Sequence, residues 1–161
     1  HSLFFYLIVY MITSLCVWSV VLSTNTCLNE KRSKTLVDLA FVSSANPLLG
    51  FTGMLAFFSL AGVPPLVGFF AKMGIFVSAL GSSLFFASIV AVLSSVISSY
   101  YYIRLIKTMY FEKVSSNFFV FPVASSSSFI MALSVFFLVF LFMDPSVLLL
   151  LTQKMALCLF H

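Results

Sequence analysis

The sequence predicts an all-α integral membrane fold with about five transmembrane helices, and three observations support this prediction. Hydrophobic residues make up 62% of the 161 residues and charged residues only 7%, whereas a soluble domain carries about 25% charged residues. The mean hydropathy is +1.20, and apolar runs long enough for helices of about 20 residues follow one another along the chain. These runs lack the alternation of apolar and polar positions that a membrane β-barrel requires. We expect a single membrane domain covering residues 1–161.

The first predicted span covers residues 2–24. Tyr6, Tyr10 and Thr13 recur along it at helical spacing, so the three side chains share one face. Hydroxyl side chains commonly bridge neighbouring membrane helices. We therefore interpret this face as a helix-packing surface.

The second predicted span covers residues 47–61 and follows a polar connection, residues 25–45. Asn46-Pro47 predicts its start, because an Asn side chain can accept a bond from a free backbone N–H of the first turn. Proline suits the first helical position, where an N–H group has no partner in the helix.

The third predicted span covers residues 66–80 and contains Lys72. The preceding Pro64-Pro65 pair cannot continue a regular helix, so we expect an interrupted helix near Pro64-Pro65 to Gly74. Lys72 is the only formal charge between residues 47 and 103. An ammonium at this depth costs about 2.5 kcal/mol or more, and such groups usually face a protein interior or a water-filled path. We predict that Lys72 lies beside a polar cavity and is the functional centre.

The fourth predicted span covers residues 84–109 and carries a stripe of hydroxyl side chains. Residues seven, four and three positions apart align on one helix face, and here they are Ser88, Ser95, Ser99 and Tyr102. The stripe would suit a hydrogen-bonded file of water, but small polar residues equally allow helices to approach closely. Both interpretations remain open.

The fifth predicted span covers residues 129–143, after a polar connection, residues 112–128. Asp144-Pro145 then predicts a new helix start. The tail, residues 145–161, combines a leucine-rich face with Thr152, Gln153 and Lys154, so we expect an amphipathic helix that lies along the membrane surface.

The net charge of +4 comes from a few residues in the connections, and no basic aromatic patch indicates a nucleic-acid partner. The three cysteines are far apart and the two histidines are the terminal residues, so neither predicts a metal site or a disulfide framework. With five spans, two basic clusters fall on opposite sides of the membrane, and the charges then predict no orientation. The clusters are Lys31, Arg32 and Lys34, and Arg104, Lys107 and Lys113.

One continuous stretch resembles a known family. Asn46-Pro47 through Ser59-Leu-Ala-Gly-Val-Pro-Pro-Leu-Val-Gly-Phe-Phe-Ala-Lys72, followed by Ser99-Tyr-Tyr-Tyr-Ile-Arg104-Leu-Ile-Lys107, is similar to the antiporter-like membrane subunits of respiratory complex I, NADH:ubiquinone oxidoreductase. Within them it resembles the C-terminal part of subunit 2 of the mitochondrial complex. The similarity extends from about Leu36 to Glu112, and Asp144-Pro145-Ser146 is also similar to the family's end.

The resemblance implies five helices equivalent to helices ten to fourteen of a fourteen-helix fold built from inverted repeats. It implies that Lys72 is the lysine of the second interrupted helix and a proton relay, with Ser88, Ser95, Ser99 and Tyr102 as accessory groups. The family's first nine helices have no counterpart in these 161 residues, which implies a split subunit whose partner polypeptide supplies them. It also implies that connections 25–45 and 112–128 lie on opposite sides of the mitochondrial inner membrane.

In this interpretation the chain is a non-redox part of a proton-translocating NADH:ubiquinone reductase. It holds no cofactor of its own, because NADH, FMN, iron-sulfur clusters and ubiquinone are bound by other subunits of the family's complex. Its neighbours would be other membrane-arm subunits and lipids. Two alternatives remain. The chain belongs to a related assembly, such as a cation/proton antiporter, a hydrogenase or a plastid NADH-dehydrogenase-like complex, or it is a structural subunit in which Lys72 pairs with a fixed carboxylate or extends to the membrane surface.

Overall fold

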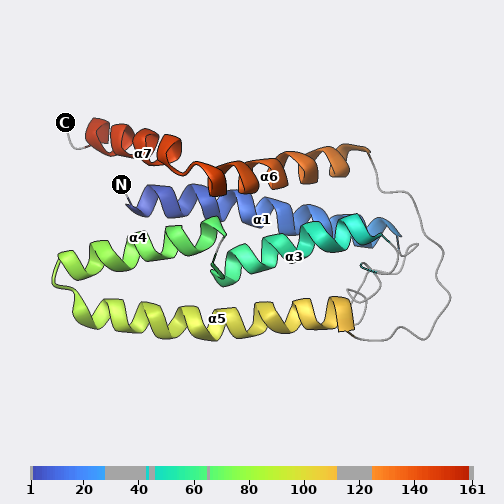
Figure 1. Ribbon diagram of the computed structural model, residues 1–161, viewed down its shortest axis with the longest axis horizontal. Coiled ribbons are helices and arrows are strands. Elements are labelled where there is room, and N and C mark those ends of the chain that lie inside the picture. The colour runs from blue at the N-terminus through green and yellow to red at the C-terminus, as the bar shows by residue number, and fades with distance from the viewer. Residues whose placement is uncertain (1, 28–42, 44–45, 65, 112–124, 160–161) are drawn as a thin grey trace.

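The computed structural model describes residues 2–27, 43, 46–64, 66–111 and 125–159, and these ranges form helices without a strand. Figure 1 shows the helices as an elongated bundle. Their bounds are α1 (Ser2–Cys27), α3 (Pro47–Ala61), α4 (Val67–Gly81), α5 (Phe85–Phe111), α6 (Ser125–Met143) and α7 (Ser146–Leu159). The predicted all-α membrane fold is confirmed.

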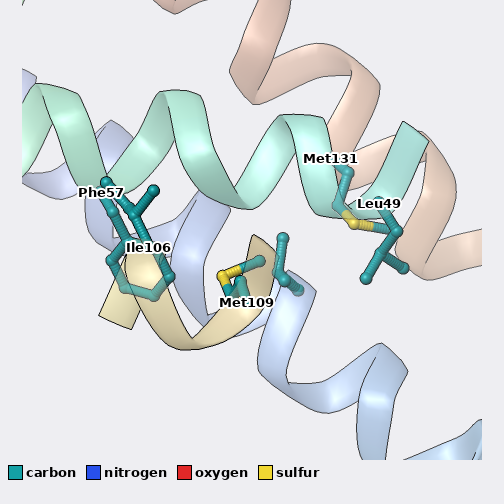
Figure 2. Packing of buried hydrophobic residues seen from close by; sticks show 6 residues of the cluster. Leu49, Phe57, Ile106, Met109 and Met131 are labelled. Carbon is teal, nitrogen blue, oxygen red and sulfur yellow. The ribbon is translucent and has the colours of Figure 1, made fainter. Parts of the chain in front are cut away.

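Helix α1 is the centre of the bundle and packs against α3, α4, α6 and α7, while α5 packs against both α3 and α4. Two clusters of buried side chains hold the helices together. The first joins α1, α3, α5 and α6 and includes Val20. Figure 2 shows five of its side chains between these helices: Leu49, Phe57, Ile106, Met109 and Met131. The second joins α1, α4 and α6: Phe5, Val9, Val67, Ala71 and Leu141. Because lipid is as apolar as these residues, close van der Waals packing is what favours the association.

Helices α3 and α4 lie end to end along the bundle, and together they run beside α5 (Figure 1). Each has 15 residues, or about 22 Å at 1.5 Å per residue, whereas the hydrocarbon core is about 30 Å thick. The sequence analysis divided this stretch into two spans, residues 47–61 and 66–80. In the structure these segments lie end to end as the two halves of one interrupted transmembrane helix.

Two helices are long and apolar enough to cross a membrane alone, within the ranges that the structure describes. They are α1, through residues 2–23, and α5. Helices α6 and α7 pass the same criterion only as a pair, and the chain bends by 91° between them. With this bend, α7 runs nearly perpendicular to α6, which is the direction of a helix that lies along the membrane surface.

The single traverse of α3 and α4 corrects the predicted sides of the two connections. The C-terminal ends of α1 and α5 and the N-terminal ends of α3 and α6 all lie at one end of the bundle (Figure 1). Connections 28–46 and 112–124 therefore leave and return at the same end. The expectation that they lie on opposite sides is wrong, because it counted one traverse too many between them. Of the described basic residues, Arg104 and Lys107 lie near this end, in the last turns of α5.

The two predicted helix starts have the expected capping contacts. The Asn46 side chain accepts a bond from Leu49 N at 3.4 Å, and Asp144 Oδ1 accepts one from Ser146 N at 3.1 Å. Helix α6 begins at Ser125, four residues before the predicted span. A serine run can enter a helix when its hydroxyls bond to carbonyls within the helix, as Ser128 Oγ does with Ser125 O at 2.9 Å.

Candidate functional site

The break between α3 and α4 is a short turn that closes the end of α3. Gly62 has φ +80° and ψ +38°, a left-handed conformation that favours glycine. Its N–H bonds to Phe58 O and Ser59 O, both at 3.1 Å, and Val63 N–H bonds to Phe58 O at 3.1 Å. The bonds from Gly62 N–H to Ser59 O and from Val63 N–H to Phe58 O form the Schellman motif of helix C-termini. The interruption spans residues 62–66, and Gly74 lies inside regular α4, so the break is shorter than the predicted range from Pro64-Pro65 to Gly74.

Lys72 completes the end of α3 from the other side of the break. It lies in the second turn of α4, and its Nζ donates to Leu60 O at 2.8 Å and to Ala61 O at 3.1 Å. An α-helix leaves its last four carbonyls without partners inside the helix. Here backbone N–H groups of the turn bond to the carbonyls of Phe58 and Ser59. The Lys72 ammonium bonds to the remaining two carbonyls, of Leu60 and Ala61. A cation is stabilised at this position because the C-terminal end of a helix carries partial negative charge.

Within the described residues, the charge of Lys72 faces two backbone carbonyls. Asp144 is the only acidic residue within the described ranges. It lies exposed at the α6–α7 junction, where its side chain accepts from Ser146. In these ranges no three His, Cys, Asp or Glu side chains come together as metal ligands. The arrangement thus suits an exchangeable proton at Nζ more than metal binding.

A cavity of about 230 Å³ lies beside Lys72, and residues from α1, α3, α4 and α5 line it. Its polar lining residues are Tyr6, Tyr10, Thr13, Ser59, Lys72, Ser98, Tyr101 and Tyr102. A second cavity of about 230 Å³ lies between α1, α4 and α5, lined by Tyr6, Lys72, Ile75, Phe76, Ala91, Ser94, Ser95 and Ser98. Three residues, Tyr6, Lys72 and Ser98, line both cavities. Lys72 therefore lies at the boundary between two partly polar spaces.

Of the four predicted accessory residues, two line the cavities and two do not. Tyr102 lines the first cavity and Ser95 the second. Ser88 is buried and Ser99 Oγ donates to Val96 O at 2.8 Å, and neither lines these cavities. Successive helix residues are about 100° apart, so a face centred on Ser98 turns Ser99 away. The four predicted residues do not form one file.

Sequence reasoning missed several residues of the cavity wall. It treated Tyr6, Tyr10 and Thr13 as a packing face, yet these residues line the first cavity. Their helical spacing was the available signal, but the spacing does not reveal what the face meets. Ser59 and Ser98 were also outside the predicted site. Ser98 Oγ donates to Ser94 O at 2.8 Å, which leaves its oxygen lone pairs able to accept a bond from the cavity.

Comparison with known proteins identifies the family. The NADH:quinone oxidoreductase/Mrp antiporter transmembrane family model matches residues 1–98, which is more than half of the chain. The chain belongs to this family. NADH-ubiquinone oxidoreductase chain 2 of Marchantia polymorpha is 38% identical over 99% of this chain and 32% of its own length. The Arabidopsis thaliana protein of the same name is 35% identical over 99% of this chain and 31% of its own length. NADH-quinone oxidoreductase subunit N of Paramagnetospirillum magneticum is 39% identical over 80% of this chain and 26% of its own length.

The match to the NADH:quinone oxidoreductase/Mrp antiporter family includes α1, α3, α4 and the first half of α5. It therefore contains Lys72, the break and most of both cavity walls, and it confirms the resemblance inferred from the sequence. The chain spans about a third of the length of the curated chain 2 relatives that it matches.

Replacing Gly62 with alanine is expected to loosen the end of α3 in this antiporter-family chain. A Cβ at this position would lie 3.0 Å from Lys72 Cδ and 3.2 Å from Nζ, and a left-handed conformation costs a residue with a side chain about 1–2 kcal/mol. Thermal unfolding of the chain in its native membrane would measure the loss. Gly74→Ala is the matched control, because its Cβ would make only an ordinary contact, 3.9 Å from Ser2 Cβ. Equal stability of the two variants would contradict this account of Gly62.

Proposed function

We propose that this chain is a membrane-arm subunit fragment of respiratory complex I, that it contributes to proton translocation coupled to NADH:ubiquinone oxidoreduction, and that Lys72 is its proton relay. One observation carries the proposal. The Lys72 amine lies where α3 is interrupted, at the boundary between two cavities, and its described hydrogen-bond partners are two backbone carbonyls.

The chemistry of these partners supports a relay. A fixed carboxylate would favour a permanently charged lysine, whereas a carbonyl can accept a hydrogen bond from either an ammonium or a neutral amine. Lys72 can therefore lose and regain a proton while it keeps a contact with Leu60 O or Ala61 O. Hydroxyl groups of Tyr6, Ser98 and Tyr102 border the spaces through which water would carry the proton. The measurement that tests the proposal is the number of protons moved per electron by the assembled complex with and without this amine.

The chain spans about a third of the length of its chain 2 relatives. Polypeptide outside these 161 residues would supply the N-terminal helices of the fold. With α3 and α4 as one interrupted traverse, this chain would provide helices eleven to fourteen of the family's fourteen, one fewer than the sequence analysis assigned. NADH, FMN, iron-sulfur clusters and ubiquinone would bind to other subunits. The membrane would be the mitochondrial inner membrane. The end of the bundle that carries Arg104 and Lys107 would face the matrix, because positive charge is retained on the inner side.

Purification of the complex through a tag on this chain is expected to recover the missing N-terminal helices, together with NADH-oxidising and quinone-reducing subunits. Mass spectrometry and NADH:quinone activity would identify them. As a control, the same purification would be carried out from membranes without the tag. Co-purification with hydrogenase or cation-antiporter subunits, and without NADH oxidation, would instead support one of the related assemblies.

A structural role is the second candidate, and one observation favours it. The two bonds from Lys72 Nζ cap the end of α3 and join the two half-helices. A lysine needed only as a cap would keep its proton permanently. An arginine at this position would then serve equally well, whereas a proton relay requires a group that can lose its proton.

A further inference from the structure

The Ser59 hydroxyl is an exception among the fully buried hydroxyl groups of the described residues. Ser59 lies in the last turn of α3 and is 2% exposed, and its Oγ has no hydrogen-bond partner within the part of the chain that the structure describes. Elsewhere in α3, Thr52 Oγ1 donates to Leu49 O at 2.9 Å, which is the usual way for a helical hydroxyl to find a partner. A buried hydroxyl without a partner is destabilising. The position therefore indicates a bound partner from outside the chain.

The surroundings of Ser59 suit water as that partner. Ser59 lines the cavity of about 230 Å³ that Lys72 also lines, and this volume holds several water molecules at about 30 Å³ each. Hydroxyl side chains of Tyr6, Tyr10 and Tyr102 line the same space. A buried water needs about three polar partners, and the wall offers them.

Ser59 and Lys72 also meet at the same end of α3. The ammonium binds the carbonyls of the two residues that follow Ser59, Leu60 and Ala61. Gly68 of α4 packs closely against Ser59, since a Cβ on Gly68 would lie 1.8 Å from Ser59 O and 3.1 Å from Ser59 Oγ. The hydroxyl and the amine thus border one space from adjacent positions.

We propose that Ser59 Oγ holds a water molecule in the first cavity and that this water exchanges protons with Lys72 Nζ. The inference rests on the proposed relay function of Lys72 and makes Ser59 its positioning residue. When Lys72 releases a proton, an N–H bond breaks and its electron pair stays on Nζ. The proton adds to a lone pair of the water oxygen, and the water passes a proton to the next water or hydroxyl in the cavity. The reverse steps return a proton to the amine.

The test compares Ser59→Ala with Ser59→Thr in the assembled complex in liposomes, with proton movement measured at matched electron flow. Ser59→Ala is expected to slow proton movement about tenfold, the factor that corresponds to a net hydrogen bond of about 1.4 kcal/mol. Ser59→Thr keeps the hydroxyl and is expected to restore the rate. Ser134→Ala is the control, because Ser134 is a buried helical serine on α6, away from both cavities, bonded to Met131 O at 3.0 Å.

Thermal dissociation of the same variants provides a readout that does not depend on pumping. If the hydroxyl is dry, Ser59→Ala removes an unpaired polar group and should stabilise the subunit. If it binds water, no such stabilisation is expected. Normal proton movement in Ser59→Ala, or failure of Ser59→Thr to restore it in a stable complex, would overturn the proposal.

Lys72→Met measured in parallel separates the inference about Ser59 from the proposed relay function of Lys72. Loss of pumping there with normal pumping in Ser59→Ala rejects only the role of Ser59, whereas normal pumping in Lys72→Met rejects the relay itself.

Discussion

On the proposed function, replacing Lys72 with methionine is expected to lower the number of protons moved per electron while the chain still assembles into the complex. Methionine matches much of the apolar stem of lysine but has no proton to release. The end of α3 loses two hydrogen bonds, at 2.8 and 3.1 Å, which contribute about 1.5–3 kcal/mol each in net terms when the donor is charged. We expect the two buried side-chain clusters to keep the helices packed despite this loss. Proton movement into sealed liposomes would be measured and divided by NADH oxidation in the same sample.

Two further variants make the result specific. Lys154→Met removes the same charge from an exposed site on α7 and should leave the ratio unchanged. Lys72→Arg keeps a cation that can cap α3 but cannot be deprotonated in a protein, so it should assemble and still pump poorly. Full pumping by Lys72→Arg would show that Lys72 serves only as a cap, and full pumping by Lys72→Met would show that the amine is not needed.

Replacing Gly68 with alanine is expected to prevent stable assembly of the subunit. A Cβ on Gly68 would lie 1.8 Å from Ser59 O and 2.7 Å from Ser59 C. Both atoms belong to the backbone, so no side-chain rotation relieves the overlap, and α3 and α4 must separate. Overpacking of this kind costs about 3 kcal/mol or more. The amount of subunit retained in the complex, measured by native electrophoresis at increasing temperature, reports the loss.

Alanine is otherwise the better helix former, by about 1 kcal/mol over glycine. Gly81→Ala provides the control, because a Cβ there would meet nothing within 4 Å. We expect this variant to assemble as well as the unaltered chain. Normal assembly of Gly68→Ala at all temperatures would mean that the two half-helices do not approach as closely as the structure places them.

Local chemistry explains which features were predictable. The helix break was predictable because Gly62, Pro64 and their neighbours restrict their own backbone. The Asn46 and Asp144 caps were predictable for the same reason, since each bond joins residues two or three positions apart. Lys72 was identifiable because a lone charge in an apolar run is unfavourable wherever its helix packs.

The wall of the cavity was less predictable. Serine and tyrosine residues serve equally well in tight helix packing and beside water, and periodicity alone assigned the stripe of Ser88, Ser95, Ser99 and Tyr102 to one site. Only Ser95 and Tyr102 of this stripe line the cavities, together with Ser98 between them and Tyr6 on α1. The difference arises because a cavity is formed by the faces of four helices at once.

The amino-acid sequence by itself determined that the chain is an all-α membrane protein with a break before an intramembrane lysine, because hydropathy and backbone restriction act over a few neighbouring residues. Tertiary structure alone decided that α3 and α4 lie end to end as one interrupted helix and that the helix ends flanking both polar connections lie at one end of the bundle. It also decided that the Lys72 amine closes α3 between two cavities. These features depend on which helix faces meet, and the meeting faces belong to residues far apart in the chain.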